Sequence, residues 1–177
     1  LLLAHDLDVI AAPEKRMFQT KIHQLKQGMP LQYLVGTTNF MGLDFRVSPA
    51  VLIPRFDTER LVEMVLQILE PISAPCVLDL CTGSGAIAVA ISHERQDAQV
   101  WATDISAEAL AVAEENNREN RTTVQFCQGN LFEPFMGGEK VFDVIVSNPP
   151  YITTEEMKQL PIDVQREPCL ALWGGPD

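Results

Sequence analysis

The spacing of hydrophobic residues changes along the first part of the chain. Over residues 1–28 apolar side chains occur among charged ones at helical spacing, and a glycine with a proline beyond it ends the stretch. Residues 31–54 instead alternate short apolar runs with glycine and proline, which predicts short strands or a hairpin rather than a helix. A clear amphipathic helix follows and runs to Leu69, and Asp57 or Thr58 can cap it.

Further along the chain, short apolar strands alternate with helical stretches. The predicted strands span residues 76–80, 99–103, 123–127 and 142–147. Helices are predicted from residue 86 and over 107–120, the second capped by Ser106. This alternation predicts βαβ units and a parallel sheet covered on both faces, which is an α/β fold. Ligands of such sheets bind at the carboxyl ends of the strands, where the polar motifs of this chain lie.

Composition narrows the partners that the protein can have. The longest apolar run is far shorter than the roughly 20 residues that cross a bilayer. The formal net charge is −11, with 13 basic and 24 acidic residues and no basic cluster, which disfavours a protein that wraps nucleic acid. The four cysteines form no C-x-x-C pair and have no histidines at ligand spacing, so we expect free thiols and no metal site. These features favour a cytoplasmic protein with no direct nucleic-acid or membrane partner.

A glycine turn follows the first strand of the predicted sheet. Gly83 and Gly85 lack a Cβ, so the backbone can turn sharply and approach a ligand closely. Asp104 closes the next strand about 20 residues later, the offset at which an acid accepts hydrogen bonds from ribose hydroxyls. The pair predicts a nucleoside-containing cofactor, and a plain tight βα connection is the alternative.

Two cofactor classes are compatible with this turn. The glycines and Ala88 also match the relaxed dinucleotide fingerprint, so NAD is a competitor. Asp79 favours S-adenosylmethionine, because a carboxylate there would repel a pyrophosphate but could bind an ammonium group directly or through water. A helix-capping role is the alternative for Asp79. After the third strand, Asn130 could bond the adenine edge while Leu131 packs on the ring, or the two could simply form a turn beside the core.

The fourth predicted strand ends in Asn148-Pro149-Pro150-Tyr151. A planar NH₂ nitrogen is a weak nucleophile, and acceptors for its two hydrogens stabilise the positive charge that forms as it attacks a methyl group. The Asn148 side-chain oxygen and the Pro149 carbonyl can be these acceptors, because prolines contribute no N–H. Tyr151 offers a flat face for stacking, and in-line placement would provide most of the rate without a general base. The alternative is a turn or a proline-rich ligand.

The chain resembles the PrmC/HemK-type release-factor glutamine N5-methyltransferases over nearly its whole length. Nucleic-acid adenine methylases share the tetrapeptide, so the distinguishing stretches are 30–36, 40–45, 51–59 and 167–177. The resemblance implies a Rossmann-like S-adenosylmethionine-dependent methyltransferase sheet, apparently truncated. It also implies a helical N-terminal segment for substrate recognition (1–30), a β-hairpin linker (31–54) and a catalytic domain without its C-terminal strands (55–177). The fourth strand should then lie at an exposed edge.

The resemblance also implies roles for individual residues. Cofactor contacts are expected from Asp79, Cys81, Thr82, Gly83, Ser84, Gly85, Asp104, Asn130, Leu131 and Asn148. Residues 148–151 would bind the target glutamine, with Arg55 and Phe56 bordering the site. The family usually has glycine at Cys81, aspartate at Asn130 and proline at Phe56, so we expect adjusted cofactor binding.

The favoured function is therefore S-adenosylmethionine-dependent methylation of the glutamine side-chain amide of a peptide chain release factor. An N6-adenine DNA or RNA methyltransferase is the main alternative, and it would need a basic channel for the flipped base. An NAD-dependent oxidoreductase leaves residues 148–151 unexplained. A non-enzymatic binding module is the remaining alternative.

Overall fold

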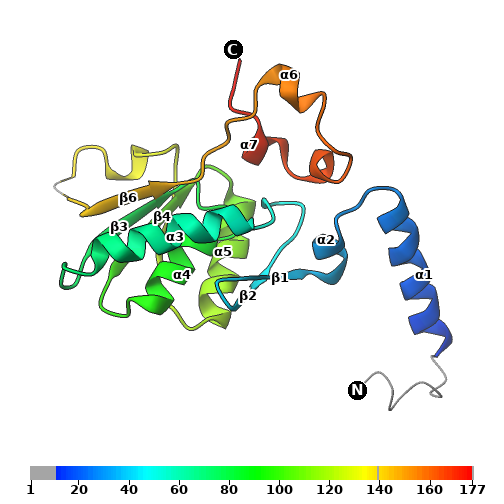
Figure 1. Cartoon of the computed structure of the whole chain (residues 1–177), viewed down its shortest axis with the longest axis horizontal. Coiled ribbons are helices and arrows are strands. Elements are labelled where there is room, and N and C mark those ends of the chain that lie inside the picture. Colours follow the sequence, from blue (N-terminus) through cyan, green and yellow to red (C-terminus); the bar gives the residue numbers. More distant parts are fainter. Residues whose placement is uncertain (1–10, 139, 177) are drawn as a thin grey trace.

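The computed structural model describes residues 11–138 and 140–176. The N-terminal part contains α1 (Ala12–Lys26), α2 (Leu31–Val35), β1 (Thr37–Phe40), β2 (Leu43–Arg46) and α3 (Phe56–Leu69). Strands and helices then alternate through β3 (Cys76–Leu80), α4 (Ala86–Glu94), β4 (Gln99–Asp104), α5 (Ala107–Glu119), β5 (Gln125–Gln128), η2 (Glu133–Phe135) and β6 (Val144–Ser147). The short helices α6 (Thr154–Met157), η3 (Val164–Arg166) and α7 (Cys169–Leu172) follow. Figure 1 shows this order, with α1 far from the sheet.

The N-terminal predictions are confirmed in part. The helix predicted over residues 1–28 is α1, which ends just before Gly28 at φ 85°. Residues 1–10 lie outside the described residues. No helix in the described ranges 11–138 and 140–176 is long and apolar enough to cross a membrane.

The prediction of strands from residue 31 onward is wrong at its start, where α2 forms a single helical turn. Gly36, at φ 91°, closes this turn, and its N–H donates to the Gln32 carbonyl at 2.7 Å. The Tyr33 hydroxyl donates to the Val51 carbonyl at 2.6 Å and so ties the turn to the segment beyond the hairpin. A left-handed glycine and a tertiary hydrogen bond thus accompany a helical turn in a stretch whose local composition favours strands.

The central sheet is parallel, with the strand order β5-β4-β3-β6. Val77 to Leu80 of β3 are buried, and this strand has neighbours on both sides. The strand β6 lies at the edge, as predicted for the fourth strand. This arrangement brings the carboxyl ends of β3, β4 and β6 together at one end of the sheet.

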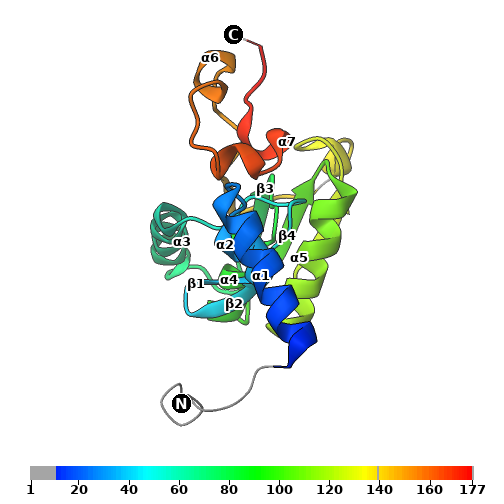
Figure 2. The same ribbon diagram turned by 90° about the vertical axis from the view of Figure 1, so that its right-hand side faces the viewer.

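The three long helices after the hairpin form one layer. The helix α4 contacts both α3 and α5, and Figure 2 shows α4 between these two helices. Val77 and Val100 belong to the core that these helices cover, while Leu78, Trp101 and Ile145 form one row across the other face. The helices α3, α4 and α5 therefore cover one face of the parallel sheet.

The second face of the sheet is covered by the segment around η2. Trp101 meets the ring of Phe135 edge-to-face at 5.7 Å, and Phe135 meets Phe142 at 5.1 Å. The Lys140 ammonium lies 3.9 Å from the centre of the Trp101 ring. Ile145, next to the edge, is 50% exposed. Aromatic packing around the short helix η2 thus covers this side of the sheet.

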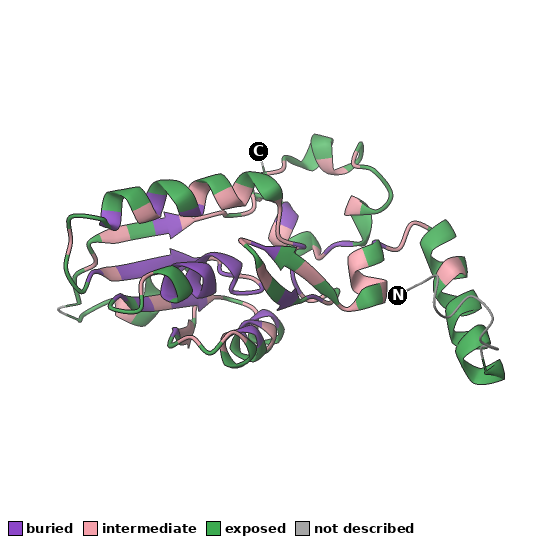
Figure 3. Cartoon of the chain, turned by 60° about the horizontal axis from the view of Figure 1, so that its bottom comes forward, coloured by how far each residue is buried: buried purple, intermediate pink, exposed green. Residues whose placement is uncertain are grey.

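The β1–β2 hairpin is part of the main core. Phe40 and Phe45 are fully buried with their rings edge-to-face at 5.9 Å. Asn116 of α5 accepts the Arg46 N–H at 2.6 Å and donates to the carbonyls of Arg46 at 3.1 Å and Ser84 at 2.8 Å. Figure 3 shows the buried residues concentrated in the central strands, α4 and the hairpin. One buried amide thus links the hairpin to the glycine turn.

Candidate active site

A cavity of about 600 Å³ lies at the carboxyl ends of the central strands. This volume is within the usual range of small-molecule and cofactor sites. Most of the predicted site residues line it: Arg55, Cys81, Thr82, Gly83, Ser84, Asp104, Asn130, Leu131, Asn148, Pro149 and Pro150. We call it the large cavity.

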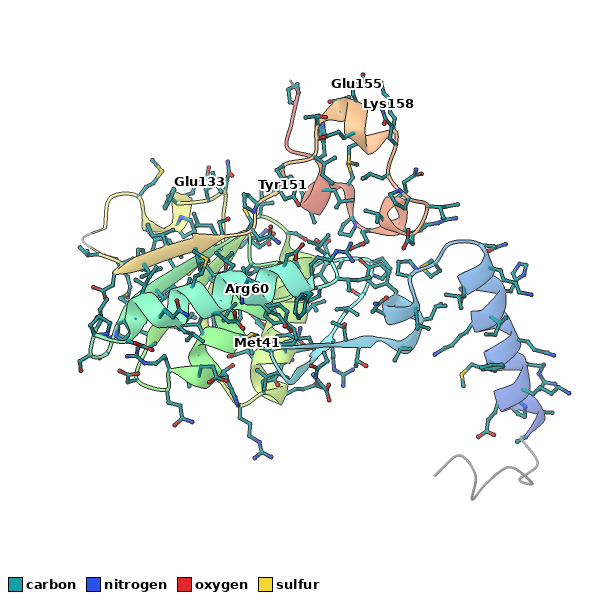
Figure 4. The ribbon with its side chains drawn as sticks, in the orientation of Figure 1. Met41, Arg60, Glu133, Tyr151, Glu155 and Lys158 are labelled. Carbon is teal, nitrogen blue, oxygen red and sulfur yellow. The ribbon has the colours of Figure 1, made fainter. Side chains whose placement is uncertain are left out.

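A second cavity of about 250 Å³ adjoins the first. Tyr151, which is 74% exposed, lines this small cavity but not the large one. Figure 4 shows Tyr151 where the chain leaves β6 toward α6 and α7. The residues that line both cavities, which we call the shared wall, are Leu52, Arg55, Thr58, Asn148, Pro149 and Ala171.

Three of the predicted site residues line neither cavity: Asp79, Gly85 and Phe56. Gly85 is needed for packing, because a Cβ there would lie 3.0 Å from the Ala113 Cβ. Phe56 begins α3 and is 76% exposed, so it does not border the site in this geometry. The ligand contacts predicted for these three residues stay predictions.

Asp79 lies buried below the glycine turn. Its Oδ2 accepts a hydrogen bond from the Thr82 hydroxyl at 2.6 Å, and its Oδ1 has no partner within the described part of the chain. Burial raises the pKa of Asp79 from 3.8 to about 7, although hydrogen bonds from Thr82 and the Ala88 backbone act in the opposite direction. Asp79 therefore supports the turn through Thr82, and a water-mediated contact with a ligand stays a prediction.

Asp104 joins the ends of two loops at the large cavity. Its Oδ2 accepts the Gly83 N–H at 2.8 Å, and its Oδ1 accepts the Ser106 N–H at 3.0 Å. A carboxylate offers about four lone-pair sites, so both oxygens can accept further bonds from ligand hydroxyls. Gly83, at φ 55°, has open space where a Cβ would be, which lets a ligand approach its backbone.

Cys81 stands in a backbone conformation that favours glycine. Its φ is 59°, in the left-handed region, and its half-buried side chain lines the large cavity. Burial and, secondarily, the charge of Asp104 raise the pKa of the thiol. The glycine expected from the resemblance thus has a steric reason, and the Cys81 side chain is held at the cavity at a cost in backbone energy.

We expect Cys81→Gly to raise the free energy of unfolding by about 0.5–1 kcal/mol, because glycine removes the left-handed strain but adds freedom to the unfolded chain. Denaturant unfolding measures the change. Cys81→Ala is the control, since it removes the thiol and keeps the Cβ, and it should not stabilise the protein. Equal stability of the glycine and alanine variants would show that backbone strain is not the cause.

The loop after β5 forms the opposite wall of the large cavity. The Asn130 N–H donates to Glu133 Oε2 at 2.8 Å, and the Glu133 N–H donates to the Asn130 carbonyl at 3.0 Å. The backbone is thus occupied by the turn into η2, while the Asn130 side chain is exposed. Leu131 is 44% exposed, and its carbonyl accepts from the Thr103 hydroxyl at 3.2 Å. The apolar side chain of Leu131 and the amide of Asn130 therefore line the large cavity next to each other.

The tetrapeptide is held by contacts that local sequence patterns do not show. The Asn148 Nδ2 donates to the Thr58 hydroxyl at 3.4 Å. The segment after α7 pairs with the loop, because the Gly174 N–H donates to the Ile152 carbonyl at 3.0 Å. A Cβ on Gly174 would lie 3.1 Å from the Tyr151 Cα, so this glycine packs directly against the loop backbone.

Glu167 lines neither cavity but holds Arg55 of the shared wall, a role that sequence reasoning missed. Its side chain is 2% exposed and accepts hydrogen bonds from the Ile53 N–H, at 3.0 Å, and from the Arg55 guanidinium. Only the resemblance in residues 167–177 pointed to this segment. Within the described residues, no group of three or more histidine, cysteine or acidic side chains could hold a metal ion.

The comparisons with known proteins agree with this geometry. Release factor glutamine methyltransferases of Moorella thermoacetica and Xylella fastidiosa are 47% and 45% identical to the chain over 99% of its length. The chain spans 62% and 64% of the length of these relatives.

Among solved structures, the T. thermophilus 16S rRNA methyltransferase RsmC in complex with AdoMet and guanosine matches 67% of the chain with a TM-score of 0.57. It is 23% identical, and the match covers 33% of that chain, so this likeness concerns the fold. The sequence model of the methyltransferase small domain family matches residues 57–163. The chain therefore belongs to the methyltransferase small domain family.

Proposed function

We propose that the intact protein transfers a methyl group from S-adenosylmethionine to the glutamine side-chain amide of a peptide chain release factor. The relatives that match 99% of the chain carry this activity in their names. The observation that carries the proposal is the position of Asn148 and Pro149 in the shared wall, between a cavity of cofactor size and a smaller one. Such a protein would act in the cytoplasm, where translation ends.

The residues of the large cavity fit S-adenosylmethionine. Asp104 keeps lone pairs for the ribose hydroxyls, and Asn130 and Leu131 offer an amide and an apolar face for adenine. The unpartnered Oδ1 of Asp79 suits an ammonium group reached through water. The bound cofactor supplies an electrophilic methyl group on a sulfonium. No phosphate-binding cluster of basic side chains is needed.

The substrate amide would lie at the shared wall. Asn148 Oδ1 and the Pro149 carbonyl accept the two hydrogens of its NH₂ group, which concentrates the lone pair on nitrogen and stabilises the charge that develops. Pro149 and Pro150 hold the loop in shape, and Tyr151 stacks on the planar group from the small cavity. We further propose that residues 1–30 recognise the substrate, 31–54 form a linker and 55–177 catalyse.

Methyl transfer from labelled S-adenosylmethionine tests this function. The intact protein is offered a release factor and, in parallel, adenine-containing DNA and RNA. We expect label on one release-factor glutamine and none after that glutamine is changed to alanine. Label on adenine instead would favour the nucleic-acid methyltransferase, against which the net charge of −11 already argues.

We expect Asn148→Ala to lower kcat by about 100- to 1,000-fold, because it removes one preorganised acceptor from the reacting group. Asn39→Ala is the matched control, since Asn39 is exposed in the β1–β2 hairpin and bonds only the Asp44 side chain. Equal activity of wild type and Asn148→Ala would remove the proposed role of this side chain.

Gly174→Ala should lower kcat by roughly 10-fold. The added Cβ would lie 3.1–3.3 Å from backbone atoms of Pro150 and Tyr151, so the loop must move by a few tenths of an ångström. Small displacements of a reacting group carry large rate penalties. Gly138→Ala is the control, because the nearest atom to its Cβ would be at 3.5 Å. Unchanged kcat in Gly174→Ala would mean that the loop tolerates the shift.

A further inference from the structure

Glu167 connects the two segments that enclose the substrate side of the site. Its carboxylate accepts the Ile53 N–H at 3.0 Å and pairs with the Arg55 guanidinium. The side chain is only 2% exposed. A buried carboxylate is costly unless it is paired and hydrogen-bonded, so these two donors fix where Glu167 and its partners lie. Beyond Glu167 the chain runs directly into Pro168 and Ala171, which line the large cavity.

The pairing fixes the position of Arg55 without using all of its donors. A guanidinium carries five N–H groups in a rigid planar fork. Among the described residues, the hydrogen-bond partner of the Arg55 guanidinium is Glu167. Arg55 belongs to the shared wall, and its side chain is 42% exposed. Several N–H donors of Arg55 are therefore available beside both cavities. The ion pair with Glu167 restricts the conformations of the Arg55 side chain.

A primary amide needs one donor in addition to the two acceptors already assigned. Asn148 Oδ1 and the Pro149 carbonyl would take the two N–H hydrogens, which leaves the substrate carbonyl oxygen without a partner. Among the other polar side chains of the shared wall, the Asn148 Nδ2 donates to the Thr58 hydroxyl at 3.4 Å, and neither group carries a charge. The Arg55 guanidinium is the charged donor of this wall.

We infer that Arg55 donates to the carbonyl oxygen of the substrate amide and that Glu167 is the positioning residue that holds it there. The inference rests on the proposed function and adds a specificity determinant to it. Asn148 and Pro149 accept hydrogen bonds from the amide nitrogen while Arg55 donates to the amide oxygen. The shared wall therefore recognises both the NH₂ group and the carbonyl group of the substrate. A carboxylate in the same place would meet two acceptors that it cannot satisfy.

A double-mutant cycle tests the pair in the intact protein with a release factor as substrate. Arg55→Met keeps most of the apolar stem and removes the donors, and it should lower kcat/KM by about 10- to 100-fold, because the buried carbonyl is left unpaired. The loss should fall mainly on KM, since this bond is the same in the bound substrate and in the transition state. The Kd for S-adenosylmethionine should stay within about 2-fold of the wild-type value.

Glu167→Gln should cause a smaller loss of kcat/KM, because its single carbonyl oxygen replaces two acceptors. If Glu167 acts through Arg55, the double variant loses no more than Arg55→Met alone. Additive losses, or wild-type kcat/KM in Arg55→Met, overturn the inference while the wild-type protein still labels glutamine. A wild-type protein that labels no glutamine overturns the proposed function and this inference with it. Unfolding midpoints of all variants exclude loss of the fold as the cause.

Discussion

Replacing Asn116 with alanine is expected to lower the free energy of unfolding by about 3–5 kcal/mol, the largest effect of any single change that we consider. Asn116 is fully buried, and its side chain makes three hydrogen bonds to the backbone. The substitution would leave the Arg46 N–H and the carbonyls of Arg46 and Ser84 without these partners. Each buried polar group that loses its partner costs about 1–3 kcal/mol.

The loss of the hydrogen bond to the Ser84 carbonyl should also affect function, because Ser84 lies in the glycine turn and lines the large cavity. We expect Asn116→Ala to weaken S-adenosylmethionine binding as well as stability. Denaturant unfolding and calorimetric titration measure the two effects. Asn120→Ala is the control, because Asn120 is the half-buried residue just after α5, where water can replace its bonds to the carbonyls of Asp44 at 3.0 Å and Asn116 at 2.9 Å. Its effect should stay below about 1 kcal/mol. Similar losses in both variants would contradict the special position of Asn116.

Asp79→Asn is expected to stabilise the protein, and increasingly so as the pH rises. Burial raises the pKa of Asp79 from 3.8 to about 7, so the folded protein binds a proton that the unfolded chain releases. The free energy of unfolding of the wild type therefore falls as the pH rises from 3.8 to about 7. An asparagine stays neutral over this whole pH range. The stability difference between Asp79→Asn and wild type should grow by about 2–3 kcal/mol from pH 5 to pH 8.

Denaturant unfolding of both proteins at pH 5, 6, 7 and 8 measures this difference. Because asparagine retains an oxygen for the Thr82 hydroxyl, the turn should keep its shape. A difference that does not change with pH would show that Asp79 is ionised in the folded protein throughout. Selective loss of S-adenosylmethionine binding in the variant would instead support the water-mediated contact.

Much of the catalytic region could be predicted because its signals are local. The strand β3, the glycine turn and the helix after it follow one another directly, and each has its own pattern of apolar, glycine or capping residues. Asp104 and Asn148 each close a strand of the sheet or follow it directly, and parallel strands place such ends together. The large cavity could thus be anticipated from spacing alone.

The features that the sequence did not show depend on contacts between distant segments. Glu167 meets Ile53 and Arg55 across more than a hundred residues, and no local pattern marks a buried ion pair of this kind. Gly85 was expected to contact the cofactor, and in the structure a Cβ at this position would lie 3.0 Å from the Ala113 Cβ of α5. Phe56 follows Arg55 directly, yet the first turn of α3 directs it to solvent.

The sequence by itself determined the α/β alternation, the cofactor turn with its acid, and the tetrapeptide at the end of β6, because each depends on residues close together in the chain. Only the tertiary structure decided which side chains stand at the shared wall and how they are held. It placed Thr58 beside Asn148, Glu167 beside Arg55, and the helices α3, α4 and α5 on one face of the sheet. The reason is that hydrogen bonds and close packing between remote segments depend on the folded geometry, which spacing along the chain does not encode.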